Sequence, residues 1–123
     1  MLEIHEKKST DGYEKILSLI NEENIKIIES FSSGIVDGYG IYSVVKDKIT
    51  IHDYDGSDLN VIDGIIRTIL FKGQFKGINC CEFRLCDNKK YDKLSILKFI
   101  NDSEKVINDI SDFMNNCKKC KEL

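Results

Sequence analysis

The stretch from residue 49 to residue 88 constrains the fold of this chain most strongly. A β-rich run at residues 48–52 leads through an acidic segment, residues 52–58, into a helical pattern, and a second β-rich run follows at residues 78–86. The helical pattern has one broad apolar stripe, formed by Leu59, Ile62, Ile65, Ile66, Ile69 and Leu70. A strand that enters the N-terminus of a helix, followed by another strand, is how many α/β proteins build a ligand crevice.

The rest of the chain supplies further strands and helices around this unit. Alternating or β-rich runs predict strands at residues 2–6, 25–31 and 39–45, and the last of these forms a hairpin with residues 48–52 around Lys46 and Asp47. Helical spacing predicts helices at residues 13–20, 91–100 and 103–117. The order β-α-β-β-β-α-β-α-α predicts an α/β (α+β) fold with a mixed, mostly antiparallel sheet and helices on both faces.

Length and charge limit the classes of protein to consider. The 123 residues suit one domain, with a core at about residues 25–100 and a C-terminal helix at 103–117. The net charge is −3 and the charges are interleaved, so no nucleic-acid partner is expected. No apolar run approaches the roughly 18 residues that span a bilayer, so no membrane partner is expected either. The chain start lacks a signal-peptide pattern, which favours the cytoplasm and five free thiols.

Over residues 39–100 the chain resembles the GNAT-type N-acetyltransferases. A hairpin strand leads straight into a long apolar helix, that helix ends at glycines before a strand, and the strand ends in Asp87-Asn88. A helix that closes on Phe99 follows. The resemblance implies an acetyltransferase-like fold that binds acetyl-CoA, or another acyl-CoA, between the strands at 48–53 and 78–86. It also implies acyl transfer from CoA to an amine, with a small molecule as the acceptor.

The resemblance also assigns site residues. The backbone of Thr50, Ile51 and His52 would hold the thioester. The backbone from Asn60 through Val61 and Ile62 to Asp63 would approach the pyrophosphate. Glu82, His52 and Tyr54 are the candidate bases for catalysis.

The chain departs from the family pattern at two positions. The family's pyrophosphate loop falls near residues 57–62, which contain neither its basic or amide residue nor its glycines. Asp53, Asp55 and Asp58 place negative charge near the same site. The family's frequent general acid, a tyrosine, falls near Ser95.

Two other clusters were considered as metal sites. The carboxylates of residues 53–58 suit a hard cation, although a turn that caps a helix is the favoured interpretation. Cys117 and Cys120 have zinc or redox spacing, and Cys80, Cys81 and Cys86 could complete a ligand set; the favoured interpretation is again that no metal binds.

Two alternative functions therefore stay open beside the acyltransferase hypothesis. The first is a non-enzymatic interaction or regulatory module, which would form a homodimer through an exposed sheet edge or the last helix. The second is a metal-binding protein that uses Cys117, Cys120 and the strand thiols.

Overall fold

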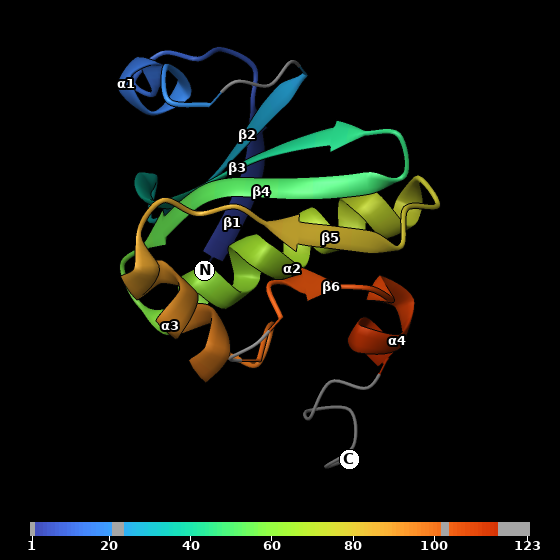
Figure 1. Ribbon diagram of the computed structural model, residues 1–123. Helices are drawn as coiled ribbons and strands as arrows, with labels where there is room; N and C mark the ends of the chain where they lie inside the picture. The colour runs from blue at the N-terminus through green and yellow to red at the C-terminus, as the bar shows by residue number, and fades with distance from the viewer. Residues whose placement is uncertain (1, 21–23, 102–103, 116–123) are drawn as a thin grey trace.

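The computed structural model describes residues 2–20, 24–101 and 104–115. Within these residues one sheet has the strand order β1-β2-β3-β4-β5-β6 (Figure 1). The strands are β1 (Leu2–Lys7), β2 (Ile25–Ser32), β3 (Ile35–Val45), β4 (Lys48–Gly56), β5 (Cys80–Phe83) and β6 (Val106–Ile107). The helices are α1 (Glu14–Leu17), α2 (Leu59–Phe75), α3 (Asn88–Ile96) and α4 (Ile110–Asn115). Among the described strands only β4 and β5 pair in parallel, so the predicted mixed, mostly antiparallel sheet is confirmed.

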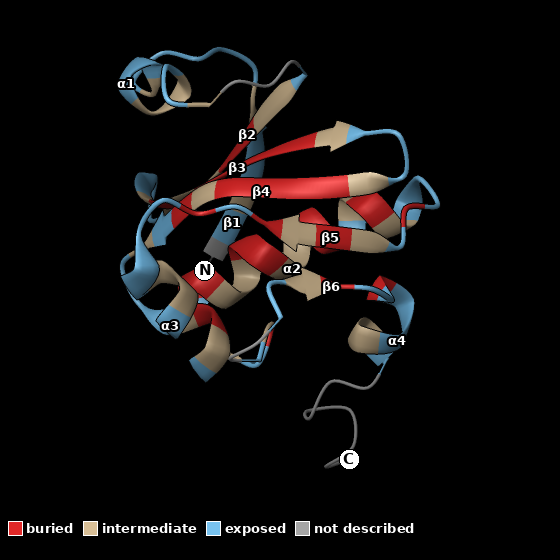
Figure 2. Ribbon diagram, viewed as in Figure 1, coloured by how far each residue is buried: buried red, intermediate tan, exposed pale blue. Residues whose placement is uncertain are grey.

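The long helix α2 covers one face of the sheet with its apolar stripe. Its inward residues are buried, and so is most of β4 above it (Figure 2). Glycines on the strands allow this close approach: a Cβ atom at Gly38 would lie 2.7 Å from Ile65, and one at Gly56 would lie 2.8 Å from Ile62. The start of the helix is also tied to the hairpin between β2 and β3, because the Ser57 amide donates to the Asp37 carbonyl at 2.9 Å.

The short helix α1 lies on the opposite face. Because Gly38 faces α2 and side chains alternate along a strand, Tyr39 points away from that helix. The Tyr13 ring packs on the Tyr39 ring with centroids 5.2 Å apart, and its hydroxyl donates to Glu29 at 2.6 Å. Helices therefore lie on both faces, as predicted. In the described ranges no helix is long and apolar enough to cross a bilayer.

The C-terminal part of the predicted fold is wrong. Residues 103–117 were expected to form one helix, but Val106 and Ile107 pair antiparallel with Glu82 and Cys81 as strand β6, and helix begins only at Ile110. The apolar spacing fits a helix equally well, and pairing with β5 decides the outcome because it buries Ile107. Cys117 and Cys120 lie outside the described residues.

Strand boundaries around the crevice also differ from the prediction. Residues 53–56 were expected to be a loop, but they extend β4, because Tyr54, Asp55 and Gly56 pair with β3. Strand β5 is shorter than the predicted 78–86 and covers only Cys80–Phe83. Helix α1 is shorter than predicted, and α3 begins and ends earlier. The longer β4 carries the chain directly to the first turn of α2.

Candidate functional site

The two central strands part before β4 ends. Strand β4 pairs with β5 only from Lys48 to Ile51, and a last backbone hydrogen bond joins the Arg84 amide to the Ile51 carbonyl at 2.9 Å. Strand β4 then continues to Gly56 along β3, whereas the chain after β5 turns into α3. An opening therefore begins at His52 on one side and Arg84 on the other. Of the predicted thioester-binding residues, Thr50 and Ile51 lie in the paired part, and His52 lies at the base of the opening.

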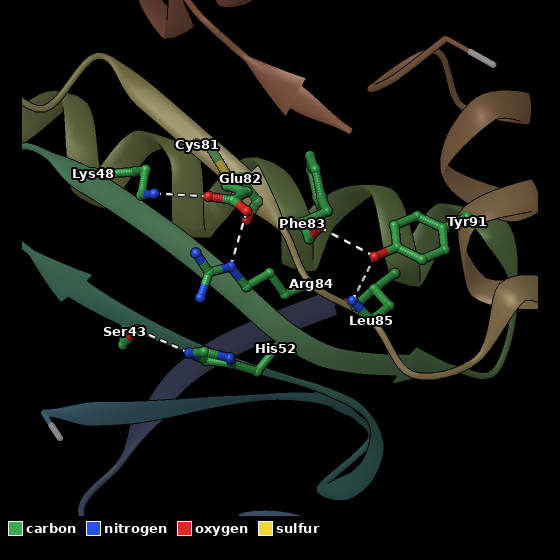
Figure 3. Close-up of polar contacts among 9 residues, drawn as sticks. All are labelled: Ser43, Lys48, His52, Cys81, Glu82, Phe83, Arg84, Leu85 and Tyr91. Atoms are coloured by element: carbon green, nitrogen blue, oxygen red, sulfur yellow. Dashed lines mark hydrogen bonds and ion pairs between the residues drawn. The ribbon is translucent and has the colours of Figure 1, made fainter. Parts of the chain in front are cut away.

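A β-bulge places His52 at this position. Ile41 is opposite Asp53 and the next residue, Tyr42, is opposite Ile51, so His52 is the extra residue on β4. A bulge redirects side chains, and here both His52 and Asp53 point away from α2. His52 Nε2 lies 2.8 Å from Ser43 Oγ (Figure 3), and both side chains are buried.

The second candidate base, Glu82, is held between two cations. Its carboxylate accepts from Arg84 Nε at 2.9 Å and from Lys48 Nζ at 2.7 Å (Figure 3). These hydrogen bonds, with that from Arg84 the larger cause, lower the pKa of Glu82 below its usual range. A carboxylate with a lowered pKa is a weaker base. Glu82 lies opposite Thr50 in the β4–β5 ladder, so it faces the same side of the sheet as His52.

The third candidate, Tyr54, lies on the other side of the sheet. Its side chain is fully buried beneath α2 and its hydroxyl donates to the Lys90 carbonyl in the first turn of α3. Burial, followed by the charges of nearby aspartates, raises the pKa of Tyr54, so the phenol keeps its proton at neutral pH. Among the three candidates His52 has the best position and chemistry for a base, and the catalytic roles of all three stay predictions.

A cluster that was not predicted from the sequence bridges the opening. Lys90 Nζ lies 2.7 Å from Asp53 Oδ1, and the Tyr39 hydroxyl donates to Asp53 Oδ2 at 2.8 Å. The ammonium also lies 5.9 Å from the ring centroid of Tyr39 and 5.7 Å from that of Tyr54. The Lys90 and Asp53 side chains are 19% and 18% exposed, so this ion pair is mostly shielded from solvent. It ties α3 to β4 where the strands have parted.

Several solved structures that resemble this chain in fold are acetyltransferases. A ribosomal-protein-S18-alanine N-acetyltransferase from Escherichia coli matches with a TM-score of 0.62 at 14% identity, over 87% of this chain and 90% of that one. A ribosomal-protein-alanine N-acetyltransferase from Brucella melitensis matches with a TM-score of 0.64 at 8% identity, over 83% and 94%. An N-acetyltransferase from Staphylococcus aureus matches with a TM-score of 0.62 at 13% identity, over 89% and 98%. No protein-family model and no curated protein matches the sequence.

The chain has the GNAT fold. The resemblance inferred from residues 39–100 is therefore confirmed at the level of the fold. The identities are too low to carry an activity across, so the functional question depends on the residues of this GNAT-fold protein itself.

The resemblance assigned the first turn of α2 to the pyrophosphate, but some backbone amides of this turn already have hydrogen-bond partners within the protein. The Asp58 side chain accepts from the Val61 amide at 2.9 Å, and the Asp58 carbonyl accepts from the Ile62 amide at 3.1 Å. Asp63 lies one helical turn after Leu59, so its amide belongs to the regular helix. Residues 60–63 were assigned to the pyrophosphate. Among them, Asn60 has an amide in the first helical turn, where backbone amides have no partner within the helix.

A phenol near the end of β5 was also missed, and its role is structural. The Tyr91 hydroxyl accepts from the Leu85 amide at 2.7 Å and donates to the Phe83 carbonyl at 3.1 Å (Figure 3). Because the Arg84 amide points to β4, the groups of Phe83 and Leu85 face the opposite edge of the strand. The Tyr91 hydroxyl therefore pairs with the edge of β5 that faces β6, past the point where β6 ends. It does not face the opening between β4 and β5.

The thiols form no metal centre in the described part of the chain. Cys81 is buried, Cys80 is half-buried and Cys86 is exposed, and all three are free. Across the described ranges, no three His, Cys, Asp or Glu residues are grouped to hold a metal ion.

Proposed function

We propose that this protein binds an acyl-CoA at the opening between β4 and β5 and transfers the acyl group to a primary amine. The observation that carries the proposal is the parting of the two parallel strands immediately after Ile51 and Arg84, with β4 continuing into the N-terminus of α2. Strand backbone beyond the β4–β5 pairing, beside a helix N-terminus, would offer hydrogen bonds to an extended ligand and to its phosphates. When bound, acyl-CoA would supply an activated thioester.

The residues of the chain would contribute base catalysis and positioning. The amine nitrogen attacks the thioester carbonyl, a C–N bond forms, the C–S bond breaks, and the thiolate of CoA leaves and takes a proton. His52, which the bulge places at the base of the opening, would accept the proton lost by the amine. Lys48 and Arg84 hold Glu82 as an anion on the same face of the sheet as His52.

We expect the protein to bind the pantetheine arm of acyl-CoA better than its nucleotide end. Asp58 caps the first turn of α2, and Asp55 accepts from the Gly56 amide at 2.8 Å. Both carboxylates lie where a pyrophosphate would approach, and like charges repel. We therefore expect weak binding of acyl-CoA, with most of the affinity supplied by the pantetheine arm.

Thermal-shift titration is the direct test of binding. Acetyl-CoA at ten times its dissociation constant would stabilise the protein by about 1.4 kcal/mol, which is a rise in melting temperature of roughly 5 °C. ADP at the same concentration should have a smaller effect, because it lacks the arm that fits the opening. Absence of a shift at millimolar acetyl-CoA would exclude the proposal.

A thiol-release assay with a panel of amines would then test catalysis. The substitution His52→Gln should lower the rate by about 10²–10⁴-fold if His52 is the base, and should leave the acetyl-CoA shift in place. The matched control is His5→Gln on the edge strand β1.

A second candidate is a non-enzymatic interaction module. The contacts that favour it are the Lys90–Asp53 bridge across the opening and the acidic caps of α2. In this version a second copy would add at the exposed edge of β1, to give a homodimer. Light scattering that shows a dimer, together with no response to acetyl-CoA, would support this candidate over the first.

A further inference from the structure

We propose that Asp53, Tyr39 and the ring of Tyr54 form a binding site for the ammonium group of the acceptor, and that Lys90 fills this site from within when no acceptor is bound. The inference rests on the proposed transfer to an amine, and it names the class of acceptor: a primary ammonium on an unbranched chain. Lys90 carries such a group, so its contacts show what the site selects.

The contacts around Lys90 Nζ are those of a cation site. One carboxylate oxygen of Asp53 receives the ammonium at 2.7 Å, and Tyr39 fixes the other oxygen at 2.8 Å. The faces of Tyr39 and Tyr54 lie 5.9 Å and 5.7 Å from the nitrogen, within the range of cation–π attraction. A carboxylate that a second hydrogen bond from Tyr39 holds in place is a preorganised receptor for an ammonium group.

The surrounding charge also favours a cation. Burial, the hydrogen bond to Asp53 and the charges of Asp53 and Asp55 all raise the pKa of Tyr39. Two carboxylates, Asp53 and Asp55, therefore act on this cluster, and among the described residues Lys90 places an ammonium against Asp53. Without that ammonium the local charge would be negative, so a cation from solution would be attracted.

The site also has the right place for an acceptor. Asp53 follows His52 on β4, beyond the last residue paired with β5, and the bulge turns both side chains to the same face. The Tyr13 ring packs on the Tyr39 ring, with centroids 5.2 Å apart. An amine that displaced Lys90 from Asp53 would therefore lie next to the base candidate at the mouth of the opening.

Chemical rescue of Lys90→Ala tests the proposal. The substitution removes the Cγ, Cδ, Cε and Nζ atoms, and n-propylammonium supplies the same atoms. We expect propylammonium chloride at ten times its dissociation constant to raise the melting temperature of Lys90→Ala by about 5 °C. The wild-type protein should show a smaller rise at the same concentration and ionic strength, because there the amine has to displace Lys90; no rise at all at any concentration would show that an acceptor does not displace Lys90. Neither 1-propanol nor propionate should stabilise the variant, because neither carries the positive charge.

Two further variants locate the effect. In the double variant Asp53→Asn/Lys90→Ala, propylammonium should no longer raise the melting temperature. The control Lys89→Ala, one residue earlier in the same helix turn, should show no rise either. If Lys90→Ala does not fold, Lys90→Met keeps the stem and vacates only the Nζ position, and ammonium chloride is then the probe.

A folded Lys90 variant that ammonium ions do not stabilise would overturn the proposal and leave Lys90 as a structural tie between α3 and β4. The assay contains no CoA, so its outcome is independent of whether acetyl-CoA binds. A positive rescue with no acetyl-CoA shift would retain the ammonium site and reject the acyl donor.

Discussion

The Lys90–Asp53 bridge should contribute measurably to stability, unlike an ordinary surface ion pair. Two unit charges about 4 Å apart attract by about 4 kcal/mol at an effective dielectric constant of about 20, and the desolvation of both groups offsets much of this energy. The two side chains are 19% and 18% exposed and their heavy atoms are 2.7 Å apart. We therefore expect a net coupling energy of about 1–2 kcal/mol, above the roughly 0.5 kcal/mol of exposed pairs.

A double-mutant cycle measures this coupling. Asp53→Asn, Lys90→Met and the double variant are unfolded in urea, and each single substitution should lower the free energy of unfolding by about 2 kcal/mol because it leaves its partner charge uncompensated. With a slope of about 2 kcal/mol per molar urea, each midpoint should fall by about 1 M.

The control cycle uses Glu6 and Lys26, which lie 3.9 Å apart on neighbouring strands with side chains 45% and 39% exposed. That pair should couple by less than about 0.5 kcal/mol. If the Asp53–Lys90 coupling is no larger than the control value, the shielding of the bridge has no energetic consequence and the reasoning is refuted.

Three other predictions concern the surroundings of the site. Because the pKa of Glu82 is lowered in the folded protein, its contribution to stability is present above the unfolded pKa and is lost as the pH falls through the folded value. The variant Glu82→Gln should therefore lose less stability than the wild type between about pH 6 and about pH 3. Thermal melting across that range measures this, and equal losses would contradict the ion-pair assignment. Gly38→Ala should lower the free energy of unfolding, measured in urea, by about 1–3 kcal/mol, because the new Cβ would lie 2.8 Å from the Asp55 carbonyl oxygen. The control Asp47→Ala, in an exposed turn, should change this free energy by less than about 0.5 kcal/mol. Tyr91→Phe should cost about 1–3 kcal/mol and accelerate hydrogen exchange at the Leu85 amide, since both strand partners of the hydroxyl lose their hydrogen bond; unchanged exchange at Leu85 would show that the hydroxyl does not protect this edge.

The sequence predicted the parts of the fold that local patterns encode. The stripe from Leu59 to Leu70 has one helical period, and the residues on either side of Lys46-Asp47 alternate, so α2 and the β3–β4 hairpin could be inferred. The two-residue strand β6 could not, because Val106 and Ile107 fit a helical spacing and only the partner strand decides between the two structures.

The site was less predictable than the fold. That β4 continues through Asp53 and Asp55 is set by pairing with β3, since aspartate and glycine have low strand propensity. The contacts of His52 with Ser43 and of Asp53 with Lys90 depend on a bulge and on the position of α3, and neither leaves a local pattern in the sequence. His52 was selected for its chemistry, whereas Lys90 had no feature that separated it from an ordinary surface lysine.

The glycines beneath α2 affect how this protein could change over evolutionary time. Gly38 and Gly56 seat the first turn of the helix directly on the sheet, and the Ser57–Asp37 hydrogen bond fixes the segment that enters it. The backbone that carries Asp55 and Asp58 therefore has little freedom to move their carboxylates away from an incoming phosphate. A descendant with tight nucleotide binding would need Asp55 or Asp58 to be replaced outright, because a shift of the backbone at this junction is blocked by the packing beneath it.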